Sequence, residues 1–324
     1  MKKFYLITGC AGFVGFSVCL ELVKKGKNII GIDNLNNYYD VEIKKKRLSI
    51  LKKFPNFKYF KINLIDFKKL KNSLNFYKIQ KIYHFAAQAG VRHSINHPEE
   101  YVSNNLVSTF NILELCRKKE IDRLIFASSS SVYGKTNSKK IDENHDTNKP
   151  LQFYAATKKS CELMAHSYSS MYKIKTTVLR FFTLYGPWGR PDMALFKFTK
   201  SILKKKKIEV YNNGNHKRDF TYIDDAVKAI IKAGKEKLSK KENFKIYNIG
   251  NGRSIKLMHY ISLIESRLNI KARIKYLPMQ KGDVKEILSD NTKIRKLRTF
   301  NKNKINVETG VNRFIDWYKE YHQI

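Results

Sequence analysis

The chain has 324 residues, enough to bury one large hydrophobic core or two modest ones. Its apolar fraction of 42% is ordinary for a globular protein, and no uncharged apolar run reaches the roughly eighteen residues that a membrane span needs. The net charge of +36 raises the question of nucleic-acid binding. The lysines are spread along the whole chain, however, whereas a nucleic-acid surface requires a cluster, so we predict no specific nucleic-acid partner. The runs 44–46 and 204–207 are expected on solvated helix faces.

The sequence shows no clear metal motif. Four cysteines form no CxxC pair and suit reduced thiols in a cytoplasmic protein. They are Cys10, Cys19, Cys116 and Cys161. His93 and His97 have the spacing of two ligands on one helical face, but Pro98 follows directly and no acidic residue stands at motif spacing. We therefore predict a solvated loop or helix start there and no metal site.

The first half of the chain alternates between apolar strands and helices. Strands are predicted at 4–8, 28–33, 57–62, 81–85, 123–127 and 176–181. The main helices are predicted at 13–25, 98–119 and 151–172. This alternation indicates a parallel sheet covered on both faces. After Phe182 the pattern becomes irregular and ends in a helix near 311–321, which suggests a second, smaller lobe.

A glycine-rich loop follows the first predicted strand and opens the first helix. Residues 8–15 read TGCAGFVG, a GxxGxxG pattern. Gly9 allows the tight turn, Gly12 lets a pyrophosphate approach the backbone, and Gly15 permits close packing of helix on sheet. The helix N-terminus adds free N–H groups and the positive end of a dipole. In this context the pattern predicts dinucleotide binding rather than a simple Gly-rich turn.

The predicted fold class is therefore α/β, with a Rossmann-type doubly wound parallel sheet. We expect the cofactor domain in residues 1–182. Residues 183–324 are expected to form a smaller C-terminal α/β lobe that mainly binds substrate, with some segments returning to the first domain.

Asp33 ends the second predicted strand. A carboxylate there can bind the adenosine ribose hydroxyls and repels a 2′-phosphate, which predicts NAD rather than NADP. The alternative is a surface turn, since Asp33-Asn34 is also good turn chemistry.

Tyr154 and Lys158 stand four residues apart in a predicted helix, so their side chains share one face. Oxidising an alcohol requires a base, but free tyrosine, with a pKa of about 10, is mostly protonated at neutral pH. Lowering that pKa by about three units takes roughly 4 kcal/mol. One cation about 4 Å away supplies this at an effective dielectric constant of about 20. The pair therefore predicts a catalytic base and its activating cation.

A serine-rich segment, residues 127–134 (ASSSSVYG), ends a predicted strand on the same sheet. Ligand sites of parallel sheets lie at such carboxyl ends. If the strand continues, Ser129 and Ser131 point the same way and can hold a reacting hydroxyl against Tyr154. A polar turn without function is the alternative.

These features together resemble the extended short-chain dehydrogenase/reductases over nearly the whole chain. Longer segments are similar to the bacterial UDP-glucuronate 4-epimerases. They are residues 31–40 (GIDNLNNYYD), 84–92 (HFAAQAGVR), 180–193 (RFFTLYGPWGRPDM) and 217–225 (KRDFTYIDD).

The resemblance implies roles for particular residues, with Tyr154 as the base and Lys158 also binding the nicotinamide ribose. The implied cofactor-binding set is Gly9, Gly12, Phe13, Val14, Gly15, Asp33, Asn34, Asn63, Leu64, Ala86, Ala87, Tyr154 and Lys158. The implied substrate-binding set is Gln88, Arg92, Ser129, Ser131, Thr183, Arg190, Tyr211, Arg218 and Asp283. In that set, Ser129 and Ser131 contact the sugar O4, Thr183 and Arg190 lie near the sugar carboxylate, Arg218 and Asp283 face UDP, and Tyr211 lies near the uridine. Asn63 departs from the family pattern, which usually has an adenine-binding aspartate there.

Arg190 also admits a structural interpretation, as a loop arginine bound to backbone carbonyls. An arginine nevertheless suits a carboxylate, because its paired N–H groups match the two oxygens.

The implied activity is NAD-dependent interconversion of UDP-glucuronate and UDP-galacturonate through a 4-keto intermediate, by a homodimer built on helices 98–119 and 151–172. A UDP-glucuronate decarboxylase and a UDP-glucose-type 4-epimerase are the enzyme alternatives. A 4,6-dehydratase is disfavoured because Ser130 and Ser131 stand where those enzymes have an acidic pair. A cofactor-sensing or nucleic-acid-binding protein on the same fold is the non-enzyme alternative, since fold alone does not decide function.

Overall fold

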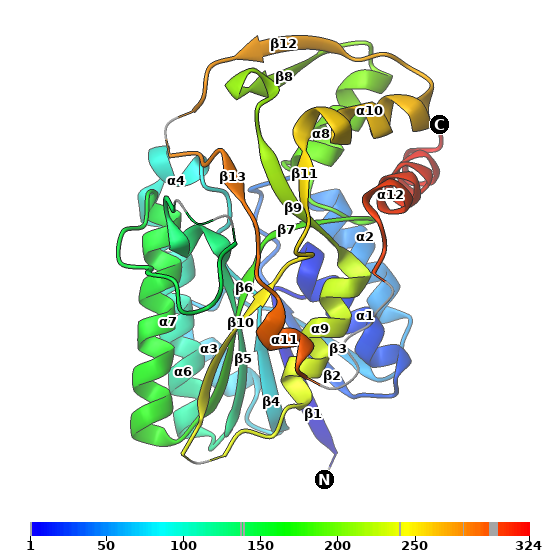
Figure 1. Ribbon diagram of the computed structural model, residues 1–324. Helices are drawn as coiled ribbons and strands as arrows, with labels where there is room; N and C mark the ends of the chain where they lie inside the picture. The colour runs from blue at the N-terminus through cyan, green and yellow to red at the C-terminus, as the bar shows by residue number, and fades with distance from the viewer. Residues whose placement is uncertain (1, 137, 139, 240, 281, 298–303) are drawn as a thin grey trace. The chain divides into compact units, whose positions relative to one another are not determined.

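The computed structural model describes residues 2–324 except 137, 139, 240, 281 and 298–303. The chain divides into two compact units (Figure 1). The first contains residues 1–136, 144–181 and 229–247, and the second contains residues 137–143, 182–228 and 248–324. Among the described residues, no helix combines the length and the apolar character needed to span a membrane.

The first unit is built on a sheet with the strand order β10-β6-β5-β4-β1-β2-β3. These strands are β1 (Lys3–Thr8), β2 (Ile29–Asp33), β3 (Phe57–Lys61), β4 (Lys78–His84), β5 (Arg123–Ser129), β6 (Lys175–Phe181) and β10 (Phe244–Ile249). From β3 to β6, neighbouring strands pair in parallel. The chain order reverses between β1 and β4, and ligands of such sheets bind at the carboxyl ends of strands beside that switch point.

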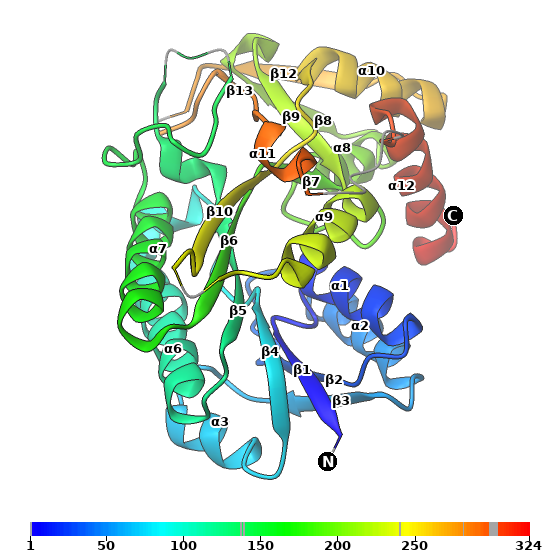
Figure 2. The same cartoon turned by 60° about the horizontal axis from the view of Figure 1, so that its bottom comes forward.

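Helices cover both faces of this sheet. They are α1 (Phe13–Lys24), α2 (Val41–Lys52), α3 (Phe67–Ser73), α4 (His93–Asn96), α5 (Pro98–Tyr101), a π-helical turn (Val102–Val107), α6 (Ser108–Lys118) and α7 (Phe153–Tyr172). Figure 2 shows α1 and α2 on one face and α6 and α7 on the other. The strands between them are apolar on both faces, so that Leu6, Ile30 and Leu124 are fully buried. The predicted doubly wound α/β fold is thereby confirmed.

The predicted helix 98–119 is wrong in one respect, because a π-helical turn interrupts it. The turn directs the side chain of Asn105 inward, where it is almost fully buried. The Oδ1 atom of Asn105 accepts from the Gln88 N–H at 2.8 Å, and its Nδ2 donates to the Thr157 hydroxyl at 3.0 Å. The turn thus ties the segment after β4 to α7, in keeping with the frequent occurrence of such turns at functional sites.

The second unit contains smaller sheets. β9 (Lys217–Tyr222) pairs with β7 (Thr183–Tyr185), β11 (Ser254–Lys256) and β13 (Glu286–Ile287), while β8 (Lys207–Tyr211) pairs with β12 (Arg273–Leu277). The helices are α8 (Ala194–Leu203), α10 (Leu257–Leu268), α11 (Thr292–Arg295) and α12 (Val307–His322), while α9 (Ile223–Lys235) runs from the second unit into the first. The run 204–207 is exposed as predicted but is not on a helix, because residues 204–206 form the turn after α8 and Lys207 begins β8.

Buried Asp219 organises the loops of the second unit. Its carboxylate accepts hydrogen bonds from the N–H groups of Asn251 at 2.6 Å, Gly252 at 2.9 Å and Ser289 at 3.0 Å. Because a carboxylate bound by several N–H groups fixes each of those backbones, Asp219 holds β9 in place beside the chain that leads into α11.

Candidate cofactor and catalytic site

The glycine loop connects β1 to α1 at the switch point of the first sheet. Gly9 has a φ of 70°, and a Cβ there would lie 2.8 Å from the Ala86 nitrogen. A Cβ on Gly15 would lie 2.0 Å from the Gly9 carbonyl oxygen. Gly12 is the N-cap of α1 and has no side chain to bind the first-turn N–H groups, which leaves those of Phe13 and Val14 available to a ligand. This is a cradle that fits the pyrophosphate of a dinucleotide.

Asp33 stands at the end of β2, beside that loop. Its Oδ2 accepts from the Ala11 N–H at 3.0 Å and its Oδ1 from the Leu35 N–H at 2.9 Å. Burial raises the pKa of Asp33, while these N–H groups oppose the rise. Each oxygen keeps acceptor capacity for a ribose hydroxyl, so the geometry fits the predicted role.

Lys44 does not lie on a solvated helix face, so that prediction was wrong for this residue. Its side chain is buried, and its ammonium donates to the Asn36 carbonyl oxygen at 2.6 Å and lies 4.3 Å from the centre of the Tyr39 ring. Arg47, one turn further along α2, is also buried and donates to the Ala11 carbonyl oxygen at 2.8 Å. Both cations are therefore used to fix the loops around Asp33.

The remaining predicted cofactor residues follow the ends of β2, β3 and β4. The Asn63 Oδ1 accepts from the Ile65 N–H at 3.3 Å, so this amide caps a turn. The Leu64 carbonyl accepts from the Asn111 side chain at 2.7 Å, and the Ala86 N–H donates to the Thr8 hydroxyl at 3.2 Å. Asn34 and Ala87 lie in the loops after β2 and β4.

Gln88 carries an unsatisfied donor. Its side chain is almost fully buried, and its Oε1 accepts from Asn36 at 3.3 Å. Its Nε2 has no hydrogen-bond partner within the part of the chain that the structure describes. Burying an unpaired amide donor is costly, and a bound ligand would remove that cost.

Tyr154 lies in the first turn of α7, and Lys158 follows one turn later on the same face. The Tyr154 ring packs edge-on against Tyr101, with centroids 6.0 Å apart. Lys158 is buried with its ammonium 4.5 Å from the centre of the Phe126 ring. Burial lowers the pKa of Lys158, and the neighbouring Cys161 and Glu162 oppose that shift. A buried cation one helical turn from a phenol is the arrangement that a phenolate base needs.

The two candidate serines differ from the sequence expectation. β5 ends at Ser129, and residues 130–133 form a 3-10 turn, so Ser129 and Ser131 do not alternate along one strand. Instead the Ser129 hydroxyl accepts from the Ser131 N–H at 3.2 Å. Ser129 is buried and Ser131 is partly exposed. The Ser129 hydroxyl thus caps the turn that begins here.

A buried ion pair stabilises the end of β5, where this turn begins. Arg180 on β6 donates to both carboxylate oxygens of Glu162 on α7, at 3.0 and 2.8 Å, and both side chains are at most 3% exposed. The Ser128 hydroxyl donates to the same carboxylate at 2.5 Å. The pair connects β5, β6 and the helix that carries Tyr154.

His84, at the end of β4, is neutral. Its Nδ1 lies 2.7 Å from the Thr8 hydroxyl and its Nε2 3.2 Å from the Thr109 hydroxyl. Burial, with a smaller contribution from Lys158, lowers the pKa of His84 to about 3. A neutral ring at this position links β4 to β1 beside the glycine loop.

The second unit contains the remaining predicted substrate residues except Arg92. Thr183 and Arg190 line one pocket together with Tyr185, Phe220 and Phe314. The Arg190 guanidinium is paired with Asp192, its Nε lying 3.0 Å from Oδ1 and its Nη2 2.5 Å from Oδ2. A neighbouring carboxylate is thus one structural partner of this arginine.

Arg218 and Asp283 are brought together. The Arg218 Nη2 lies 2.8 Å from the Asp283 Oδ1, and the Nε2 of buried His216 lies 3.5 Å from its Oδ2. Tyr211 ends β8, and its hydroxyl donates to Glu209 at 2.9 Å. Arg92, in the first unit, is exposed just before α4.

Sequence reasoning missed Asn105, Glu162 and Arg180 as supports of the site. Only Arg180 stands within an otherwise apolar run, and that was the available signal, because polar groups in such positions are normally buried with a partner. The partners come from other elements, however, and no spacing identifies them.

Comparison with known proteins adds the following findings. The model of the NAD dependent epimerase/dehydratase family matches residues 5–250. Protein CapI of Staphylococcus aureus is 44% identical over 98% of this chain and 99% of its own length. A UDP-glucuronate 4-epimerase of Thermodesulfobacterium geofontis is 40% identical over 98% of this chain and 96% of its own. The crystal structure of UDP-glucuronic acid 4-epimerase from Bacillus cereus, in complex with UDP-glucuronic acid and NAD, has a TM-score of 0.90 at 30% identity and covers 98% of this chain and 99% of that one.

Proposed function

The chain belongs to the NAD-dependent epimerase/dehydratase family, and from that premise we propose that it interconverts UDP-glucuronate and UDP-galacturonate. Its cofactor is NAD. One observation carries the proposal: Tyr154 and the buried Lys158 lie one turn apart on the same face of α7. This helix belongs to the same unit as the glycine loop. The similarity to named UDP-glucuronate 4-epimerases supports the choice of sugar.

We assign the cofactor to the first unit and the UDP-sugar mainly to the second. When bound, NAD supplies an acceptor and a donor for the hydrogen on sugar C4. Gly9, Gly12 and Gly15 shape the loop for its pyrophosphate, and Asp33 receives a ribose hydroxyl. Arg218 and Asp283 bind the UDP portion, since the charge of the guanidinium suits the diphosphate and the carboxylate can accept hydrogen bonds from hydroxyl groups.

Tyr154 accepts the proton of the O4 hydroxyl while Ser129 and Ser131 hydrogen-bond that oxygen. Lys158 stabilises the phenolate through its charge. The 4-keto sugar that results turns within the site, and Tyr154 returns a proton to O4 of the other epimer. This keto sugar is a β-keto acid, which can lose carbon dioxide when the bond between C5 and the carboxylate carbon aligns with the π system of the 4-keto group. The site must therefore hold the carboxylate so that this bond stays out of alignment. Arg190 is the candidate for that task.

The expected dimer is proposed to form on α6 and α7. Within one chain these helices lie side by side, and the Tyr168 hydroxyl on α7 donates to Glu114 on α6 at 2.9 Å. Large apolar side chains on the same pair are exposed, among them Phe110, Leu163 and Met171. An exposed apolar patch of this kind marks an interface. Sedimentation of the purified chain as a monomer would contradict this assignment.

Replacing Arg190 by leucine tests the substrate class. If Arg190 holds the sugar carboxylate, kcat/KM for UDP-glucuronate should fall at least about tenfold further than kcat/KM for UDP-glucose, since a hydrogen bond to a charged group contributes about 1.5–3 kcal/mol. UDP-glucose has no carboxylate to lose. Steady-state kinetics with both substrates measure the difference.

Arg273→Leu is the matched control, because Arg273 is an exposed arginine on β12 of the same unit. It should change neither value appreciably. An equal fall on both substrates in Arg190→Leu would make Arg190 a structural partner of Asp192 and contradict its assignment to the carboxylate.

A further inference from the structure

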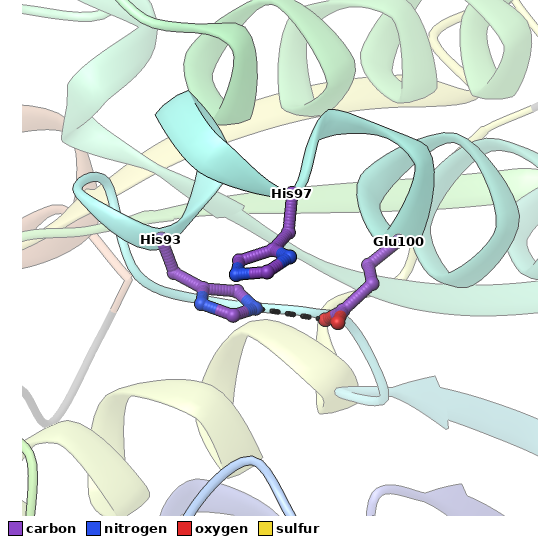
Figure 3. Close-up of side chains that lie close together, drawn as sticks. All are labelled: His93, His97 and Glu100. Atoms are coloured by element: carbon purple, nitrogen blue, oxygen red, sulfur yellow. Dashed lines mark hydrogen bonds and ion pairs between the residues drawn. The ribbon is translucent and has the colours of Figure 1, made fainter.

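Three side chains with metal-binding atoms gather where α4 meets α5 (Figure 3). The Nε2 of His93 lies 2.9 Å from the Oε2 of Glu100. The His97 ring stacks on the His93 ring, with centroids 4.3 Å apart. One ligand atom from each residue lies within 4.8 Å of the other two, and the described part of the chain holds no second group of three such residues.

Glu100 is the acidic partner that spacing alone does not reveal. In a continuous helix, seven residues rise about 10 Å, too far for His93 to touch Glu100. Here α4 ends at Asn96, and His97 leaves the helical conformation with φ −134° and ψ 56°. Pro98 then begins α5 and brings Glu100 back beside His93. No acidic residue stands at motif spacing, as the sequence indicates, but this break brings Glu100 to His93 from outside that spacing.

We propose that His93, His97 and Glu100 bind a divalent transition-metal cation of the zinc type. Two imidazoles and one carboxylate form a donor set that Zn²⁺ accepts, with a fourth position for water. Tetrahedral bonds of about 2.0–2.2 Å place neighbouring ligand atoms about 3.3–3.6 Å apart. The 2.9 Å contact between His93 and Glu100 would have to open by about 0.4–0.7 Å to reach that spacing. His97, whose side chain is 49% exposed, can turn toward the same point.

The positive charge of the chain does not prevent cation binding at this cluster. The net charge of +36 repels cations at long range, but at about 0.15 M salt, charges more than roughly 8 Å away are largely screened. Locally, the carboxylates of Glu99 and Glu100 stand beside the two imidazoles. The competing soft ligands are hidden, because Cys10, Cys19, Cys116 and Cys161 are all buried.

Occupancy of the site would stiffen a corner next to the proposed catalytic base. His93 packs on Tyr38, with centroids 4.9 Å apart, and more loosely on Tyr101, with centroids 6.1 Å apart. Tyr101 in turn contacts Tyr154, and its hydroxyl donates to the Gly90 carbonyl oxygen at 2.5 Å. A cation that joins α4 to α5 would therefore fix the segment from Gly90 to Tyr101.

The test is isothermal titration calorimetry, in which ZnCl₂ is added to the chelator-treated, full-length protein near pH 7.5. We expect about one Zn²⁺ per chain. His97→Gln and Glu100→Gln should each weaken binding at least about tenfold, since even the loss of a residue that only orients a ligand costs that much.

His259→Gln is the matched control, because His259 is exposed and lies outside the cluster. It should bind Zn²⁺ as the parent protein does. Co²⁺ in place of Zn²⁺ gives a visible absorption spectrum that reports nitrogen and oxygen ligands directly, and thermal melting checks that each variant is folded. The proposal is overturned if the parent protein binds no Zn²⁺, or if folded His97→Gln and Glu100→Gln bind it as tightly as the parent.

Discussion

Replacing Tyr154 by phenylalanine should lower turnover at least about a hundredfold, the lower range for the loss of a general base. The substitution removes only the hydroxyl. The ring keeps its edge-on packing against Tyr101, so α7 and the buried Lys158 should remain in place. The glycine loop and Asp33 are untouched. Purified variant should therefore carry as much NAD as the parent, as measured by release on denaturation.

Tyr172→Phe on the same helix is the control for this experiment. Tyr172 is exposed near the end of α7, and the loss of its hydroxyl should leave turnover unchanged. A folded Tyr154→Phe protein with near-normal turnover would show that the phenol is not the base. A variant that loses NAD as well as activity would point to a structural role of the hydroxyl instead.

Replacing Glu162 by glutamine should lower the free energy of unfolding by about 3–5 kcal/mol. Arg180 is 2% exposed and would keep its charge in the protein interior without the carboxylate that neutralises it. The glutamine amide would leave one acceptor oxygen for the donors of Arg180 and Ser128, and its NH₂ group would replace the second acceptor. Urea unfolding followed by circular dichroism measures the change, as a lower midpoint at an unchanged slope.

Glu42→Gln is the matched control, because Glu42 pairs with Lys45 at 2.7 Å on the surface, where the two side chains are 70% and 59% exposed. Exposed pairs contribute about 0–1 kcal/mol, so this variant should stay close to the parent. Equal, small changes in both variants would mean that the buried pair is not a principal support of β5, β6 and α7. Replacing Glu162 and Arg180 together by apolar residues should restore much of the loss.

The architecture of the first unit was accessible from sequence because its signals are local. An apolar run followed by glycines and a helix, as in residues 4–25, predicts a strand, a turn and a helix without knowledge of distant contacts. The second unit gave weaker signals. Its short strands, such as β11 and β13, are too brief for periodicity to reveal. Segment 229–247 belongs to the first unit because it packs there, and no local sequence pattern encodes that packing.

The site shows the same division between local and distant signals. Residues four apart on a helix share one face, so the placement of Tyr154 and Lys158 could be predicted from their spacing. The structure has both on α7, as predicted. The π-helical turn at Asn105, the burial of Lys44 and the contact of His93 with Glu100 each depend on partners from another segment. A lysine run indicates a solvated face only where no neighbouring loop needs a buried cation, and the sequence does not contain that information.

Deuterium at C4 of the substrate provides the most direct test of the proposed epimerase chemistry. UDP-glucuronate carrying deuterium at C4 is incubated with the purified protein and no added cofactor, and the products are examined by mass spectrometry and NMR. We expect UDP-galacturonate with the deuterium retained at C4, in a mixture that approaches equilibrium between the epimers. Loss of the deuterium to water would contradict transfer through a cofactor that stays bound, and a UDP-pentose released with carbon dioxide would make the protein a decarboxylase instead.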